Sequence, residues 1–231
     1  MYYILSHQII MKYHITSVVL ILAVLTVPSF GWDGNAKTTR YWDCCKPSCA
    51  WPDNVPTGGA VNSCLKDGYN LAPPNARNIC GGGGGPGGPN FVCTNQQPFS
   101  IGDILYAFSA SNVECCTCYE LQFTDTALAG KTMITQVINK GGDLGQNHFD
   151  IQIPGGGLGI FDGCTPQYGS WSGGERYGGV SSAAQCNNLP EQVRGGCFWR
   201  FNDFRNADNP NVNFRRINCP SALVDRSNCR A

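Results

Sequence analysis

The chain has 231 residues, with 16 basic and 16 acidic side chains and no formal net charge. Proteins that bind the phosphate backbone of nucleic acids carry a positive surface, so this balance argues against a nucleic-acid partner. The 29 Gly, 9 Tyr and 5 Trp residues instead indicate long loops and flat stacking surfaces, which suit neutral, hydroxyl-rich ligands such as sugars.

The N-terminal 31 residues have the layout of a secretory signal peptide. Lys12 precedes an uninterrupted apolar run at residues 18–27, and small or turn-forming residues follow as far as Gly31. The run is too short for a stable membrane anchor, although an uncleaved anchor is the alternative. No later segment is apolar for long enough to cross a membrane. We therefore expect cleavage near Gly31 and a secreted, extracellular protein that has no membrane partner.

All 14 cysteines follow the expected cleavage site. An even number of cysteines in an oxidising compartment predicts seven disulfides, but the sequence does not give their pairing. A zinc cluster is the alternative. Because only one histidine, His148, follows the cleavage site, we expect no metal and no cofactor.

Alternating apolar and polar residues predict several short β-strands, and helical periodicity is weak. The expected strands are residues 38–43, 118–125, 131–139, 148–155 and 212–219. Short helical stretches are expected at residues 100–110 and 182–193, where Ser100 and Ser182 are candidate N-caps. The fold class is therefore mainly β, in one domain, because no linker rich in proline and serine divides the chain.

Two glycine-rich segments are expected to be loops. The run at residues 81–88 lies between Cys80 and Cys93 and reads as a surface loop. The sequence PGGGLGIFDGC at residues 154–164 has the glycine content of a phosphate-binding loop, but it lacks the strand-loop-helix context. A nucleotide site is therefore not expected.

The candidates for catalysis are carboxylates. A hydrolytic triad needs a histidine, and the chain has no GxSxG motif around a nucleophilic serine. Cysteine nucleophiles are disfavoured because the cysteines are expected to be paired. In residues 148–153, the period of a strand places three apolar side chains on one face and His148, Asp150 and Gln152 on the other. One face packs in the core, and the other presents an acid.

A second acid lies in the sequence TTRYWDCCKPSCAW, residues 38–51. Alternation places Thr39, Tyr41 and Asp43 on one face, opposite Thr38, Arg40 and Trp42, and three cysteines are available to fix the turn that follows. Two carboxylates across a groove are what glycosidic bond cleavage requires, one as acid and one as base or nucleophile. The alternative is that Asp43 caps a turn and Asp150 lies on an exposed strand.

Six motifs spread over nearly all of the chain after residue 31 resemble those of glycoside hydrolase family 45 endoglucanases. They are TTRYWDCCKPSCAW, CCTCYELQFT, GGDLGQNHFDIQIPGGGLGIFDGC, RYGGVSS, CFWRF and NADNP. The resemblance implies a six-stranded double-psi β-barrel with long, disulfide-stapled loops, crossed by an open substrate groove. It implies an endo-β-1,4-glucanase that inverts the anomeric configuration, acts on a β-1,4-glucan and is monomeric. Residues 32–231 would then form a single catalytic domain with no carbohydrate-binding module.

The resemblance also implies roles for individual residues. Asp43 falls on the general base, Asp150 on the general acid and Asp143 on an assisting acid in a mobile loop. The substrate-binding candidates are Tyr41, Trp51, Tyr177 and His148, although a tryptophan beside cysteines is often only a core residue.

Departures from the family pattern and two rival functions stay open. Lys140 stands where a small hydroxyl residue is expected, which puts the closure of the Asp143 loop in doubt. A non-hydrolytic, expansin-like wall-loosening protein or a carbohydrate-binding protein of the barwin type would resemble the same barrel. Such proteins lack the base, so the presence of Asp43 favours an enzyme.

Overall fold

The computed structural model describes residues 31–55, 58–81 and 87–230. The expected signal peptide lies outside these residues, except for Gly31, and so does most of the glycine-rich run at residues 81–88. Within the described ranges, no helix is both long enough and apolar enough to cross a membrane.

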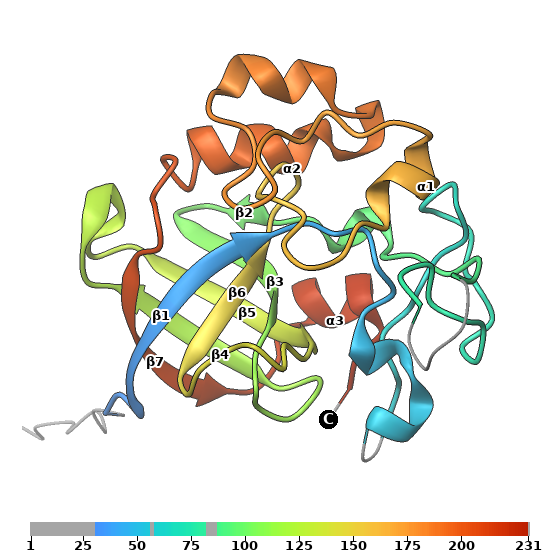
Figure 1. Ribbon diagram of the computed structural model, residues 1–231. Coiled ribbons are helices and arrows are strands. Elements are labelled where there is room, and N and C mark those ends of the chain that lie inside the picture. Colours follow the sequence, from blue (N-terminus) through green and yellow to red (C-terminus); the bar gives the residue numbers. More distant parts are fainter. Residues whose placement is uncertain (1–30, 56–57, 82–86, 231) are drawn as a thin grey trace, which may run out of the picture. The chain divides into compact units, whose positions relative to one another are not determined.

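Six strands close into a β-barrel, and a seventh extends it (Figure 1). The order around the barrel is β3-β5-β4-β7-β1-β6, and pairing of β3 with β6 closes the ring. β1 with β6 and β3 with β5 are parallel pairs, and the other neighbours are antiparallel. The strands are β1 (Gly34–Tyr41), β2 (Phe99–Ile101), β3 (Ile104–Ala110), β4 (Cys118–Phe123), β5 (Thr132–Asn139), β6 (His148–Gln152) and β7 (Asn211–Ile217). The predicted mainly-β fold and six-stranded barrel are confirmed.

Apolar side chains from alternate strand positions fill the barrel. None of the following is more than 2% exposed: Leu105, Leu121, Met133, Val137, Phe149 and Ile151. The period of two predicted from the sequence of β6 is thus correct, since its apolar face is buried and its polar face points elsewhere. A side chain of this size contributes about 1.5 to 3 kcal/mol when it is fully buried.

One predicted helix is wrong. Residues 100–110 form the hairpin of β2 and β3, in which Gly102, at φ +57°, and Asp103 make the turn. Gly-Asp between two apolar runs is itself a hairpin signal, and β-branched and aromatic residues on both sides favour strands. The sequence therefore held the correct indication, which the loosely helical spacing of the apolar residues obscured.

The second predicted helical region is correct and continues further than expected. Ser182 and Gln185 form a capping box at the start of the 3₁₀-helix η5 (Ala183–Asn188). After Pro190 the chain continues as α2 (Glu191–Asn202), whose Trp199 packs on the barrel core. The other helices are α1 (Cys164–Tyr168), α3 (Ser221–Ser227) and the 3₁₀-helices η1 (Ser48–Ala50), η2 (Pro52–Asn54), η3 (Thr94–Gln96) and η4 (Thr126–Leu128).

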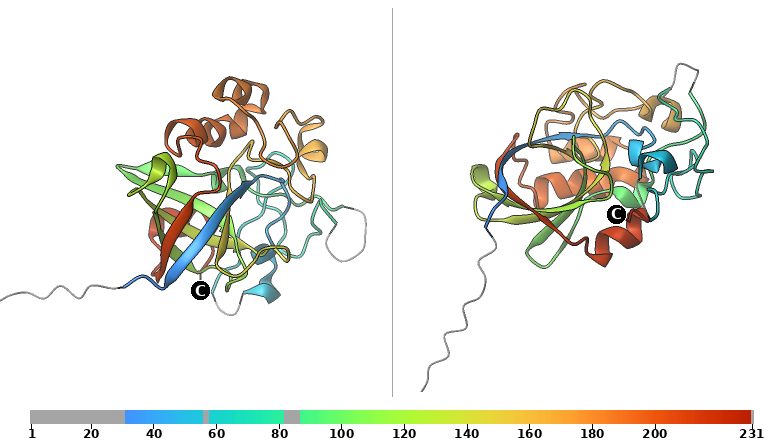
Figure 2. Two further views of the ribbon diagram at one scale, coloured as in Figure 1. Left: turned by 60° about the vertical axis from the view of Figure 1, so that its left-hand side comes forward. Right: turned by 90° about the horizontal axis from the view of Figure 1, so that it is seen from below.

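Seven disulfides pair all 14 cysteines, as predicted. They are Cys44–Cys164, Cys45–Cys80, Cys49–Cys115, Cys64–Cys93, Cys116–Cys229, Cys118–Cys219 and Cys186–Cys197. The described part of the long connection from β1 to β2 lies to one side of the barrel in every view (Figures 1 and 2). Because this connection has little regular structure, its disulfides replace the packing that helices or strands would supply.

The backbone segment that follows β6, at Gly155, packs closely against the segment at Gly179 and Val180. The carbonyl of Gly155 accepts the N–H of Val180 at 2.9 Å and the guanidinium of Arg200 at 3.0 Å. Gly179 has φ +75°, and a Cβ on it would lie only 1.8 Å from the Gly155 oxygen. This contact fixes the segment that carries Tyr177.

We expect Gly179→Ala to destabilise the protein more than Gly130→Ala. Gly130 also has a positive φ, +83°, but a Cβ there meets nothing within 4 Å. The control should therefore lower the free energy of unfolding by only about 1 to 2 kcal/mol, the cost of a positive φ at a residue with a Cβ. Gly179→Ala should lower it by about 1 to 3 kcal/mol more, because of the steric clash. Denaturant unfolding with the disulfides intact measures both, and equal losses would show that the contact is not tight.

Candidate active site

A single groove of about 920 Å³ brings together most of the candidate residues. Its walls come from β1 and the turn after it, from β6 and the loop before it, and from three later loops. The residues that line it include Thr39, Arg40, Tyr41, Asp43, Asn139, Asp143, His148, Asp150, Ile160, Phe161, Tyr177 and Asp208.

Asp43 lies in a turn that is fixed from several sides. Its Oδ1 accepts the backbone N–H of Cys45 at 2.9 Å, and its carbonyl accepts the N–H of Gly163 at 2.7 Å. Cys44 has φ +60°, and disulfides tie Cys44 to Cys164 and Cys45 to Cys80. Asp43 therefore does cap a turn, and the same turn presents its carboxyl group to the groove.

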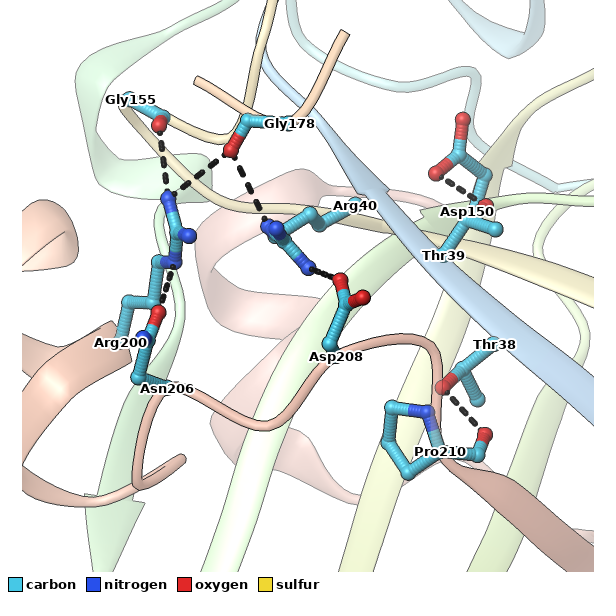
Figure 3. Close-up of polar contacts among 10 residues, drawn as sticks. All are labelled: Thr38, Thr39, Arg40, Asp150, Gly155, Gly178, Arg200, Asn206, Asp208 and Pro210. Carbon is cyan, nitrogen blue, oxygen red and sulfur yellow. Dashed lines mark hydrogen bonds and ion pairs between the residues drawn. The ribbon is translucent and has the colours of Figure 1, made fainter. Parts of the chain in front are cut away.

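Asp150 lies on β6, opposite Thr39 of β1 in the parallel pairing. Its Oδ1 accepts the Thr39 hydroxyl at 2.6 Å (Figure 3). Phe149 and Ile151, its neighbours along the strand, point into the barrel core and fix the direction of the acid. The predicted placement of Asp150 on the open face of this strand is correct.

Burial raises the pKa of both carboxyl groups. It raises the pKa of Asp43 to about 7, against the hydrogen bond from Cys45, and the nearby charge of Asp150 adds to the rise. It raises the pKa of Asp150 to about 6, against the hydrogen bond from Thr39, with a further rise from Asp143 and a decrease from Arg40. Between these two pH values the pair therefore holds about one proton.

Tyr41 is buried, and its hydroxyl is held by two side chains. Its hydroxyl donates to Gln152 Oε1 at 3.3 Å and accepts from Asn139 Nδ2 at 3.1 Å. Burial, together with the charges of Asp43 and Asp150, raises its pKa well above the ordinary value. The phenol thus stays neutral, and its ring offers an apolar surface to a ligand in the groove.

The other candidates divide into those that line the groove and one that does not. Asp143, His148 and Tyr177 line it, and Tyr177 is 72% exposed. Trp51 is absent from the lining residues. Its ring lies 3.2 Å from Lys46 Nζ, measured to the ring centroid, and Lys46 also donates to two backbone carbonyls.

Several groove residues were not identified from the sequence. Ile160 and Phe161 are each 51% exposed in the glycine-rich loop that was set aside as a nucleotide site. Two adjacent large apolar residues among glycines were the available signal. Arg40, expected on the opposite face of its strand, also reaches the groove. Its guanidinium donates to Gly178 O at 3.3 Å and pairs with Asp208 at 2.8 Å (Figure 3).

The described residues contain no group of three or more His, Cys, Asp or Glu side chains arranged to hold a metal ion. The groove offers two carboxyl groups with raised pKa values beside aromatic and apolar surfaces.

Comparison with known proteins gives one consistent family. Residues 35–230 match the family model described as glycosyl hydrolase family 45. The chain is 44% identical to an endoglucanase of Cryptopygus antarcticus over 91% of this chain and 96% of that protein. It is 42% identical to an endoglucanase of Phaedon cochleariae over 86% of this chain and 85% of that protein. The crystal structure of the cellulase from C. antarcticus, an Antarctic springtail, aligns with a TM-score of 0.79 at 47% identity, covering 85% of this chain and 96% of that one.

We expect Asp43→Asn to stabilise the protein, and only above acidic pH. The folded state holds the Asp43 proton more tightly than the unfolded state does, so the ionised carboxylate lowers the free energy of unfolding as pH rises from about 4 to about 7. Asparagine keeps an oxygen for the Cys45 N–H but carries no charge. The increase in the free energy of unfolding should be near zero at pH 3.5 and about 1 to 3 kcal/mol at pH 8. This is less than the whole pKa shift corresponds to, because Asp43 keeps some contact with water.

Denaturant unfolding at the two pH values measures this gain. Asp103→Asn, the same change at an exposed position, is the control. A gain of equal size at pH 3.5 and pH 8 would show that it does not come from the charge of Asp43.

Proposed function

The chain belongs to glycosyl hydrolase family 45, and from this premise we propose that it is an endo-β-1,4-glucanase that hydrolyses cellulose-type glucans with inversion at the anomeric carbon. The observation that carries the proposal is the placement of Asp43 and Asp150 in one groove, each with a pKa raised towards neutral. The names of the related proteins, endoglucanase and cellulase, support the substrate class.

In the proposed reaction, Asp150 donates its proton to the glycosidic oxygen while Asp43 takes a proton from the attacking water. The reactive form needs Asp43 ionised and Asp150 protonated. Because the pKa values of the two carboxyl groups lie close together, the single proton is shared between them in the free protein. A glucan that covers Asp150 removes water from it, which raises its pKa and moves the proton to the acid.

The remaining candidates have supporting roles in this proposal. The charge of Asp143 raises the pKa of Asp150 and so helps to keep the acid protonated. Tyr41, Tyr177 and His148 contact sugars along the groove, where aromatic rings offer flat apolar faces. Trp51 is proposed only as an outer contact, since its ring lies against Lys46.

An expansin-like or purely carbohydrate-binding protein is the alternative, and no described feature favours it over the enzyme. We also propose that the protein is secreted, that residues 32–231 act as one catalytic domain, and that it works as a monomer without a cofactor. Seven disulfides support secretion, because they form and persist in oxidising compartments.

Asp43→Asn and Asp150→Asn should each lower the rate of reducing-end release from carboxymethylcellulose by about two to four orders of magnitude. Both keep the shape of the side chain, so circular dichroism should show folded protein. The control Asp103→Asn should keep wild-type activity. If a folded Asp43→Asn variant kept most of its activity, the base assignment would be wrong.

The first product should be the α-anomer. A single displacement, with water attacking the face opposite the leaving group, turns a β-linkage into an α-configured hemiacetal. Proton NMR within the first minutes of hydrolysis, before mutarotation, detects it. An initial β-product would require a covalent intermediate with the two carboxyl groups about 5 to 5.5 Å apart, and it would exclude Asp43 as a water-activating base.

A further inference from the structure

The hydroxyl of Thr39 lies between two titratable groups of the groove. Its Oγ1 is 2.8 Å from His148 Nε2 and 2.6 Å from Asp150 Oδ1. The parallel register of β1 and β6 produces this arrangement, because Lys37 pairs with His148 and Thr39 with Asp150. Residues two apart on a strand share a face, so Asp150 and His148 both face the Thr39 hydroxyl.

A hydroxyl group has one hydrogen, so Thr39 donates to one of these partners and accepts from the other. An ionised Asp150 only accepts, so Thr39 must donate to it, and His148 must then donate through an Nε2–H. A protonated Asp150 can itself donate to Thr39 Oγ1. The Thr39 hydrogen then points to His148 Nε2, which accepts it only if the ring is neutral with its hydrogen on Nδ1.

We propose that Thr39 is a positioning residue that couples the protonation of Asp150 to the state of His148. Neutral His148 with Nδ1–H is paired with protonated Asp150, and His148 with Nε2–H is paired with the carboxylate. This rests on the proposed function, since it concerns the same acid. An imidazolium ring donates at both nitrogens and therefore opposes the proton on Asp150.

The charges around the two groups are compatible with this coupling. The charged or titratable groups facing them are Lys37, Arg40, Tyr41, Asp43 and Asp143. Burial lowers the pKa of His148, Lys37 lowers it further and Asp143 acts in the opposite direction, so the ring is mostly neutral at pH 7. Arg40 is held in place by Asp208 and Gly178 (Figure 3).

Thr39→Val tests the coupling, because it removes the hydroxyl and keeps the branched shape. Thr39→Ser keeps the hydroxyl and should restore wild-type behaviour. Thr38→Val is the matched control on the neighbouring residue, whose hydroxyl donates to the Pro210 carbonyl instead (Figure 3). Thr39→Ala is measured in parallel and gives the same readout if the valine variant does not fold.

The first measurement uses free protein labelled with ¹⁵N-histidine, with His148→Gln to assign the signal. As pH falls from 8 to 5, Asp150 takes up its proton, and the Nδ1–H form of neutral His148 should increase in the wild type, Thr39→Ser and Thr38→Val. Thr39→Val should lose this increase. No increase in the wild type, or the same increase in Thr39→Val, would overturn the proposal.

The second measurement is the pH profile of kcat on a soluble β-1,4-glucan, which reports the pKa of the acid in the substrate complex. The Thr39 hydrogen bond stabilises the carboxylate, so Thr39→Val should move the alkaline limb upward by about one pH unit, and Thr38→Val should not. An unmoved limb in an active Thr39→Val variant would contradict the coupling. Absence of hydrolysis in the wild type would instead contradict the proposed function, and the NMR result, which needs no substrate, would decide the coupling by itself.

Discussion

The parallel pairing of β1 with β6 is the contact on which the candidate active site depends. It joins segments more than one hundred residues apart and places Thr39 against Asp150. The pairing is held in register by Phe149 and Ile151, since a slip of one residue would turn them out of the barrel core and bury the polar face instead. Because β1 ends two residues before Asp43, the same pairing also brings the second acid to the groove.

The turn after β1 shows that a structural and a chemical role need not be alternatives. Asp43 accepts a hydrogen bond from Cys45 within the turn, and disulfides of Cys44 and Cys45 tie that turn to the start of α1 and to the loop at Cys80. A carboxylate that caps a rigid turn loses little further freedom when it orients a water molecule. The cysteines around this acid thus limit the movement of the group that the proposed reaction needs to hold still.

Two arginines fix the wall of the groove that carries Tyr177. Arg40 and the buried Arg200 both donate to the carbonyl of Gly178, next to the exposed Tyr177, and Arg200 also donates to Gly155 (Figure 3). Burial lowers the pKa of Arg200 to about 10, and the charge of Arg40 adds to this effect. This wall is therefore held by charged guanidinium groups that donate hydrogen bonds to backbone carbonyls. Burial of the two acids, by contrast, raises their pKa values and lowers the stability of the fold.

The sequence by itself determined the mainly-β class, five strands, the number of disulfides, and the strand face that carries Asp150. These features follow from local periodicity, from short motifs and from the number of cysteines, all of which can be read without knowing which distant segments meet. Asp43, expected on the face of a strand over residues 38–43, instead lies in the turn after β1, which ends at Tyr41. The hairpin turn at Gly102 and Asp103 was also encoded locally but was read as a helix. The cysteine pairing, the place of Ile160 and Phe161 in the groove wall and the Thr39 hydroxyl shared by two groups were decided only by the tertiary structure. Each of them requires segments distant in the sequence to meet, and closure of the barrel sets which segments meet.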